Sequence, residues 1–386
     1  MLIRVSTHPV INWTEDGHDC SAGWRSASAP PPGRVVVIDE RTTADEAYGL
    51  ACQGTALLWH GDFHDARQML IALARRADRR SRKRTAAAAA AAVSAAQFHR
   101  YRQGRAQRAR TLGMLLVQLD AHDQLALRRA PDVREACREA YGAADRPTLI
   151  SLRSLLGVIG AHEWRSKGIE IAAAGGRIHP HYAVFAPIRS EYVDLVSAAP
   201  LPALATSHSV AFDIGTGTGV LAAVLARRGI GRVVATDLDP RARACACENV
   251  ERLGWASQVE VVQADLFPAG RAALVVCNPP WLPARPTSAL EQAIYDPQSR
   301  MLRGFLSALP GHLEAGGEGW LILSDLAEHL GLRSREELLA AIAQAGLKVL
   351  GRDDIRPRHP RSVDAADLLH RARAAEVTSL WRLAPR

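Results

Sequence analysis

The sequence predicts an α/β protein whose C-terminal half forms a doubly wound sheet behind a mainly helical N-terminal domain. After Pro200-Leu201-Pro202, short runs of strand-forming residues alternate with helical runs, which is the pattern of repeated βαβ units. Before that point, apolar residues recur mostly at helical spacing. The length of 386 residues is too great for one ordinary hydrophobic core, so two domains are expected.

The N-terminal half divides into a lead-in and a helical domain. Residues 1–33 show no sustained period and end in a proline-rich stretch, so an irregular lead-in is expected. Residues 34–175 are predicted to form a mainly helical, arginine-rich domain that is a candidate for substrate recognition. Its apolar side chains fall at helical spacing in the runs 66–77, 112–119 and 149–159. Residues 176–386 form the second predicted domain.

The charge of the chain is positive and comes almost entirely from arginine. The formal net charge is +8, and lysine occurs only at Lys83, Lys167 and Lys348. Arginines gather in the stretches 75–84 and 100–110. A solvated helical face is the preferred interpretation of these stretches, and a nucleic-acid-binding patch is the alternative.

The composition favours a cytoplasmic protein. No run of 18 or more residues lacks a polar interruption, so no membrane span is expected. The six cysteines are scattered, which indicates reduced thiols, and their spacing does not fit a structural zinc site. We therefore expect no metal and no membrane partner, and the oligomeric state is not readable from the sequence.

Seven short runs are predicted as the strands of the C-terminal sheet. They cover residues 209–214, 232–236, 258–263, 273–277, 319–323, 347–351 and 378–383. Helices are predicted at 219–228, 240–253, 299–313 and 334–345, and Pro240 and Gly254 mark the start and end of one of them. Open sheets of this kind bind ligands at the carboxyl ends of their strands, so the loops after the strands are the candidate site.

The loop after the first of these strands is rich in glycine and opens a helix. It reads Asp213-Ile214-Gly215-Thr216-Gly217-Thr218-Gly219. Glycines at alternate positions permit a tight turn and a close approach of a ligand to the backbone. A purely structural turn or a dinucleotide site would compete with this interpretation, but the Gly-x-Gly-x-Gly spacing differs from the usual dinucleotide pattern.

The loops after the second and third strands carry acidic side chains. Asp237 lies about twenty residues beyond the glycine loop, where a carboxylate can accept hydrogen bonds from both ribose hydroxyls of a nucleoside. Its alternative role is to cap the following helix, which Asp239 could do instead. In the third loop, Asp265 could accept a hydrogen bond from an adenine amino group, while Leu238 or Leu266 packs on the ring. A plain loop aspartate is the alternative for Asp265.

The loop after the fourth strand reads Asn278-Pro279-Pro280-Trp281 and is the candidate catalytic site. Two consecutive prolines fix the backbone and remove two N–H donors, so nearby carbonyl groups are held in one geometry. An acceptor NH2 group can donate one hydrogen to Asn278 and another to the backbone, which orients the nitrogen lone pair for attack. Trp281 can stack on a planar group above the prolines, and a core tryptophan in a rigid turn is the alternative.

From about Ala183 to the C-terminus, the combined motifs resemble the class I S-adenosylmethionine (SAM) dependent methyltransferases with an Asn-Pro-Pro-aromatic motif. They look most like the HemK-type, small-domain relatives. The resemblance implies a seven-stranded sheet with 378–383 as its antiparallel seventh strand. It implies catalysis by Asn278, Pro279 and Pro280, with Trp281 beside them. It also implies a SAM site made by Asp213, Gly215, Gly217, Gly219, Asp237 and Asp265, to which the loops add Thr216, Leu238, Leu266 and Asn278.

The methyl acceptor is less clearly indicated. Trp281 stands where the glutamine methyltransferases usually carry tyrosine, and residues 185–192 only loosely echo their Pro-Arg-Pro-x-Thr-Glu segment. The resemblance favours the N5 nitrogen of a protein glutamine, whereas the charge favours adenine N6 or guanine N2 of RNA or DNA. A SAM-binding protein without catalysis is a third possibility. Arg189 and Glu191 are predicted, by position alone, to gate the SAM pocket.

Overall fold

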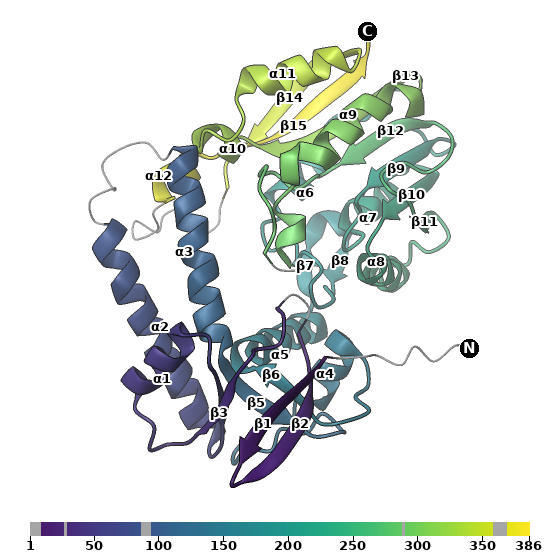
Figure 1. Ribbon diagram of the computed structural model, residues 1–386. Coiled ribbons are helices and arrows are strands. Elements are labelled where there is room, and N and C mark those ends of the chain that lie inside the picture. Colours follow the sequence, from purple (N-terminus) through teal and green to yellow (C-terminus); the bar gives the residue numbers. More distant parts are fainter. Residues whose placement is uncertain (1–8, 27–28, 86–93, 288–289, 358–368) are drawn as a thin grey trace. The chain divides into compact units, whose positions relative to one another are not determined.

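The computed structural model describes residues 9–26, 29–85, 94–287, 290–357 and 369–386, with no description of the side chains of 80–85 and 290. The chain divides into two compact units (Figure 1). The first consists of Met1–Ala90 and His99–Glu163, and the second of Ala91–Phe98 and Trp164–Arg386. The boundary therefore falls near residue 163, twelve residues before the predicted one at 175.

The first unit is built on a six-stranded mixed sheet in the order β1-β2-β6-β5-β4-β3. Its strands are β1 (Val10–Glu15), β2 (His18–Trp24), β3 (Val35–Ile38), β4 (Ala56–Trp59), β5 (Leu115–Leu119) and β6 (Thr148–Ser151). Its helices are α1 (Ala44–Cys52), α2 (Phe63–Thr85), α3 (from Ala95 to Gly113), α4 (Arg134–Tyr141) and α5 (from Leu152 to Lys167). The short helical ends Ala95–Phe98 of α3 and Trp164–Lys167 of α5 belong to the second unit.

The prediction of an irregular lead-in over residues 1–33 is wrong for residues 10–24. These residues form an antiparallel hairpin, β1 with β2, which is joined to the sheet through β6. The turn consists of Asp16 and Gly17, with φ angles of 48° and 79°. Two residues with positive φ match the right-handed twist of a hairpin, so the Asp-Gly pair was the local signal that the sequence analysis overlooked.

The prediction of a mainly helical first domain missed this sheet. The run at 112–119, interpreted as helical, contains the strand β5, whose residues Leu115, Leu116, Val117 and Leu119 are fully buried. A strand with neighbours on both faces is apolar throughout and does not show the alternation that identifies a half-exposed strand. The helical run beginning near Asp62 is confirmed as α2.

The second unit has the predicted doubly wound sheet, with seven strands in the order β11-β10-β9-β12-β13-β15-β14. The strands are β9 (Val210–Ile214), β10 (Arg232–Asp237), β11 (Val259–Gln263), β12 (Ala272–Cys277), β13 (Leu313–Ser324), β14 (Leu347–Ile355) and β15 (Thr378–Pro385). Every predicted strand is confirmed. β15 runs antiparallel to both β13 and β14, as expected of a seventh strand. A separate hairpin pairs β7 (Ile169–Ile171) with β8 (Gly176–Ile178).

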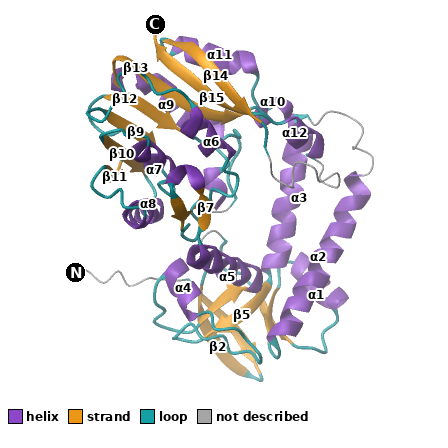
Figure 2. Cartoon of the chain, turned by 180° about the vertical axis from the view of Figure 1, so that it is seen from behind, coloured by secondary structure: helices purple, strands orange, loops and turns teal. Residues whose placement is uncertain are grey.

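Helices cover both faces of this sheet (Figure 2). The longer ones are α6 (Glu191–Ala198), α7 (Val220–Arg227), α8 (Pro240–Arg252), α9 (Arg300–His312) and α11 (Arg335–Gln344), and the short ones are α10 (Leu326–His329) and α12 (His370–Ala375). Helices α6, α7 and α8 contribute to one hydrophobic core and α9 and α11 to another, so the sheet lies between two cores. The four predicted helices correspond to α7, α8, α9 and α11.

The strand order brings the predicted loops to one edge of the sheet. β11, β10, β9 and β12 are neighbours and run parallel, so their carboxyl ends lie together. Ile214 at the end of β9 pairs with Thr236 of β10 on one side and with Cys277 of β12 on the other. The direction of strand order reverses at β9, which is where doubly wound sheets bind ligands.

Candidate functional site

The glycine loop connects β9 to α7 and adopts the backbone conformation that its glycines permit. Gly215, Gly217 and Gly219 have φ angles of 73°, 56° and 79°, in the left-handed region that other residues rarely adopt. The backbone N–H groups of Gly215 and Thr216 donate to the carbonyl oxygen of Thr236, at 2.9 and 2.8 Å. The loop is thereby fixed to the end of β10.

Asp213 shapes this loop from beneath. Its side chain is buried, and its Oδ2 accepts hydrogen bonds from Thr216 Oγ1 at 2.7 Å and from the Ala222 N–H at 3.0 Å. Burial raises the pKa of Asp213 to about 6, although both hydrogen bonds act in the opposite direction. These contacts make Asp213 a residue that positions the loop, so its predicted contribution to a cofactor site is indirect.

The three glycines differ in the space above them. A Cβ atom on Gly219 would lie 3.1 Å from the Ala246 Cα, and one on Gly215 would lie 2.6 Å from the Met301 Cε. A Cβ on Gly217 would meet no atom within 4 Å. Gly217 therefore borders open space at the carboxyl edge of the sheet, where a bound ligand can approach the backbone.

Asp237 joins the end of β10 to the glycine loop. Its Oδ2 accepts from the Gly217 N–H at 3.0 Å, and its Oδ1 accepts from the Asp239 N–H at 2.9 Å. The alternative role as a helix cap does not apply to Asp237, because Asp239 caps α8 by accepting from the Arg241 N–H. Each carboxylate oxygen has more than one acceptor position, so Asp237 retains capacity for the hydroxyl groups of a ribose.

The side chains around Asp237 suit an adenine ring. Leu238 is 55% exposed, which is unusual for a large apolar side chain and leaves a surface that a flat ring can cover. Asp265 is bound through Oδ2 by Arg300 at 2.6 Å, and its Oδ1 remains the candidate acceptor for an amino group. Leu266 has a φ of 78°, a strained conformation typical of functional loops. Residues with these properties at these places fit a nucleoside cofactor.

The Asn278-Pro279-Pro280-Trp281 loop follows β12 directly. Pro279 is buried, and Asn278, Pro280 and Trp281 are half-buried. The Trp281 Nε1 donates a hydrogen bond to the Asn278 Oδ1 at 2.9 Å. The structure thus joins the two residues that were predicted to act on the acceptor.

Trp281 also contacts Arg189, which the sequence analysis assigned to the cofactor pocket by position alone. The guanidinium carbon of Arg189 lies over the indole ring, 5.6 Å from its centroid. Arg189 Nη2 donates to the Glu376 Oε1 at 3.1 Å, and Ser324 Oγ donates to the same oxygen at 2.7 Å. The pairing of β13 with β15 brings Ser324 close to Glu376, and the helix α6, which follows Arg189, packs against β15.

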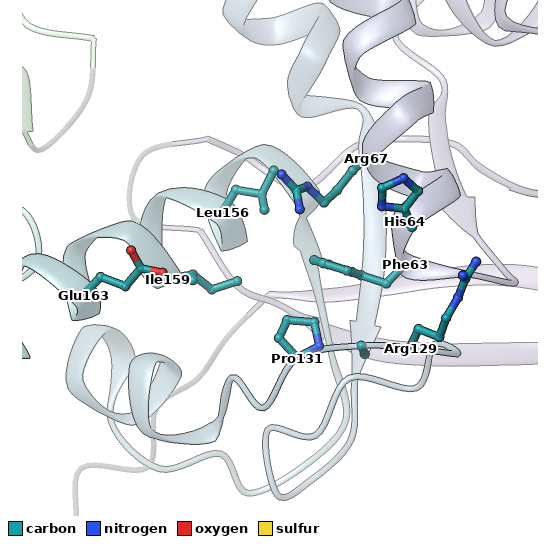
Figure 3. A pocket seen from close by; sticks show the side chains of 9 residues that line it. Phe63, His64, Arg67, Arg129, Pro131, Leu156, Ile159 and Glu163 are labelled. Carbon is teal, nitrogen blue, oxygen red and sulfur yellow. The ribbon is translucent and has the colours of Figure 1, made fainter.

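A pocket of about 620 Å³ lies in the first unit, and Figure 3 shows its lining. It is bounded by the start of α2, the loop around Arg129 and the helix α5. Its lining combines apolar side chains with charged ones, namely Phe63, His64, Arg67, Arg129, Ala130, Pro131, Leu156, Ile159 and Glu163. Arg129 pairs with the buried Asp62 at 2.5 Å. None of the predicted site residues lines this pocket.

The arginine stretches are partly engaged within the first unit. Arg76 pairs with Asp45 at 2.6 Å, and Arg108 pairs with Asp78 at 2.7 Å. Arg75, Arg79 and Arg105 are exposed. The side chains of residues 80–84, which belong to the first stretch, lie outside the described part of the chain.

The strand order and the edge loops define an α/β domain of the class I methyltransferase type. Residues 176–335, which lie within the second unit, match the family model of the methyltransferase small domain. The predicted resemblance to the methyltransferases is thereby confirmed. Within the described residues, no helix is both long and apolar enough to span a membrane.

Several curated proteins are similar to this domain. One is a ribosomal protein L11 methyltransferase of Pelotomaculum thermopropionicum, 40% identical over 146 residues, which are 37% of this chain and 39% of the relative. Another is a release factor glutamine methyltransferase of Cereibacter sphaeroides, 36% identical over 33% of this chain and 50% of the relative. A third is a tRNA1(Val) (adenine(37)-N6)-methyltransferase of Shewanella loihica, 28% identical over 44% of this chain and 70% of the relative.

The first two of these relatives are matched over half of their own length or less. The three names include protein and tRNA acceptors. Their similarity therefore supports a methyltransferase domain in this chain but does not identify its methyl acceptor.

Proposed function

We propose that the protein is a SAM-dependent N-methyltransferase that methylates a planar NH2 group, with the side-chain amide of a protein glutamine as the preferred acceptor. The observation that carries this proposal is the position of the Asn278 carbonyl. It stands at the carboxyl end of β12, beside the strand that leads into the open glycine loop. An acceptor and a nucleoside cofactor would meet at that edge.

The proposed cofactor residues follow from the contacts described above. Gly217 and the loop around it would lie against the cofactor, Asp237 would bind its ribose, and Leu238, Asp265 and Leu266 would surround its adenine. Asp213, Thr216, Gly215 and Gly219 would keep the loop in shape. When bound, SAM supplies a methyl group activated by a positively charged sulfur.

The catalytic loop would act by orientation. Asn278 Oδ1 accepts one hydrogen of the acceptor NH2 group, and the rigid Pro279-Pro280 backbone presents a carbonyl for the other, so the nitrogen lone pair points away from both. The nitrogen gains the methyl group and gives up one proton to solvent. Once that proton has left, the products carry no positive charge at the reacting atoms. Alignment of the acceptor and exclusion of water therefore matter more than a strong base.

A second candidate acceptor is the exocyclic amine of RNA or DNA, at adenine N6 or guanine N2. The exposed Arg75, Arg79 and Arg105 favour it, because exposed cations attract phosphate groups. Either acceptor would need a recognition surface, which we assign to the first unit. A SAM-binding protein without catalysis is the outcome if the loop does not support turnover.

Transfer of label from methyl-tritiated SAM to a cell lysate tests the proposal. The purified protein should label a macromolecule, and Asn278→Ala should reduce the rate by about 10²-fold, as expected for loss of one positioned hydrogen bond. SAM affinity of the variant should stay close to that of the wild type. Label released only by protease supports a protein amide, and label released only by nuclease supports the second acceptor. Equal labelling by Asn278→Ala and wild type would contradict the proposed mechanism.

A further inference from the structure

The Trp281 side chain fixes the orientation of the Asn278 amide. An indole Nε1 can only donate, so the atom of Asn278 that faces it at 2.9 Å is the carbonyl oxygen. This oxygen has two acceptor positions, and the indole occupies one of them. The other remains for an N–H of the methyl acceptor. Trp281 is therefore a positioning residue for Asn278 as well as a neighbour of the acceptor.

The indole ring of Trp281 is already engaged. Arg189 lies over it at 5.6 Å, and the side chain packs against the hydrophobic cores on both faces of the sheet. A platform for a nucleobase needs an open ring face, as in proteins that stack single-stranded bases. The surroundings of Trp281 therefore favour a small planar acceptor, which needs hydrogen bonds but no stacking surface.

Arg189 is held in one place by a buried carboxylate. Its Nη2 donates to Glu376 Oε1 at 3.1 Å, and the Glu376 side chain is only 2% exposed. Ser324 donates to the same oxygen at 2.7 Å, which fixes the carboxylate in turn. The planar guanidinium is thus restrained both by the ion pair and by the ring beneath it.

One donor of this restrained guanidinium is unused. The Arg189 Nε is buried and has no hydrogen-bond partner among the described residues. Buried N–H groups in folded proteins are nearly always paired, and an unpaired one is a candidate for a partner supplied by a ligand. The Trp281 side chain contacts both this guanidinium and Asn278, so the two groups lie beside the same indole.

We propose that Arg189 is a specificity-determining residue that recognises the carbonyl oxygen of a primary carboxamide, while Asn278 holds the NH2 group on the same carbon. This inference rests on the proposed methyl transfer and specifies its acceptor. A carboxamide has its oxygen and nitrogen about 2.3 Å apart, so with a hydrogen bond at each end it bridges groups about 8 Å apart. Glu376 and Ser324 act as positioning residues because they hold the guanidinium in place.

The test uses a blocked peptide with a single glutamine between glycines as the probe. Its binding to the full-length protein saturated with S-adenosylhomocysteine is measured by calorimetry, and SAM affinity is measured separately. Arg189→Ala should weaken peptide binding by about 10-fold to 100-fold, as expected for a hydrogen bond from a charged donor. SAM affinity should change less than about twofold. Arg189→Lys retains the charge near Glu376 but lacks the planar Nε donor, so it should remain weak.

Arg352→Ala is the matched control. Arg352 also lies over a tryptophan, at 5.2 Å from the Trp381 ring, and also pairs with a carboxylate, Asp354, at 2.7 Å. It lies on β14, at an outer edge of the sheet. This control should bind the peptide as the wild type does. Glu376→Gln keeps the shape of the side chain but removes its charge, and it should weaken peptide binding without affecting SAM affinity.

Three results would overturn the inference. The first is a wild-type protein that does not bind the glutamine peptide. The second is an Arg189→Lys variant that binds it normally. The third is nuclease-sensitive label in the lysate experiment, which would preserve methyl transfer but assign it to a nucleobase. If the wild type labels nothing in the lysate but Arg189→Ala still loses peptide binding, methyl transfer is rejected and the carboxamide-binding site is supported.

Discussion

The substitution Gly217→Ala separates the shape of the glycine loop from its contact with a cofactor. Gly217 has a φ of 56°, so a side chain there is strained, but its Cβ would meet no protein atom within 4 Å. The strain is about 1–2 kcal/mol for an L-residue in the left-handed region. The variant should therefore fold, with a melting temperature lowered by a few degrees.

Gly217→Ala should also weaken SAM binding, which the loss of stability alone would not do. If the cofactor lies against Gly217, the added methyl group enters filled space, and overpacking of that kind costs about 1–3 kcal/mol. The dissociation constant for SAM should therefore rise by about 5-fold to 150-fold. Titration calorimetry measures the affinity, and differential scanning calorimetry measures the stability of the same samples.

Gly254→Ala is the control for backbone strain. Gly254 follows α8 and has a φ of 79°, and a Cβ atom added to it would likewise meet no protein atom within 4 Å. It should lose a similar amount of stability and retain the wild-type affinity for SAM. Equal SAM affinities for Gly217→Ala and Gly254→Ala would refute the placement of the cofactor against the glycine loop.

Three further predictions concern single residues. Because burial raises the pKa of Asp213 to about 6 from 3.8, the folded protein keeps a proton that the unfolded chain has released between pH 4 and 6. The contribution of Asp213 to stability should thus fall by about 3 kcal/mol as pH rises through this window, and Asp213→Asn should lack that component in urea unfolding at pH 4 and 7. If the free energy of unfolding of the wild type and of Asp213→Asn depends on pH in the same way, the raised pKa of Asp213 is wrong. Asp239→Ala should lower the free energy of unfolding by about 1 kcal/mol, because the cap of α8 is lost, without altering SAM affinity. Asp237→Ala should weaken SAM binding at least about tenfold. A calorimetric titration in which Asp239→Ala weakens SAM binding more than Asp237→Ala would exclude a ribose contact by Asp237. Gly17→Ala should destabilise the first unit by about 1–2 kcal/mol in thermal unfolding and leave SAM affinity unchanged, because its φ of 79° defines the β1–β2 turn.

The sequence was sufficient for the seven strands of the large sheet and for four helices of the second unit, because each of these elements has a local signal. Its strands are short apolar runs, Asp239 and Pro240 begin α8, and the glycines after β9 have no other use than a tight turn or a close approach. The alternation of strands and helices indicates a parallel sheet, and the parallel pairing of β10 and β12 with β9 brings the carboxyl ends of the three strands together.

The first unit was less predictable for a physical reason. Its strand β5 is buried on both faces, so its apolar run has the same composition as a buried helix. The hairpin β1–β2 did have a signal, the Asp16-Gly17 turn with alternating buried positions at Ile11 and Trp13.

The environment of the catalytic loop could not be predicted from spacing. Arg189, Ser324 and Glu376 belong to three segments that only the finished sheet brings together, and the burial of Glu376 depends on that assembly. Similarly, the aromatic residue of the motif was visible as Trp281, but its hydrogen bond to Asn278 and its contact with Arg189 are properties of the fold.

The most direct test of methyl transfer by this loop is identification of the methylated residue. The protein is incubated with a lysate and SAM carrying an isotopically labelled methyl group, the protein and nucleic acid fractions are digested, and the products are analysed by mass spectrometry. The geometry at Asn278 predicts labelled N5-methylglutamine that is absent when Asn278→Ala replaces the wild type. Label on a carbon or oxygen atom, or the same labelled product from both proteins, would contradict it.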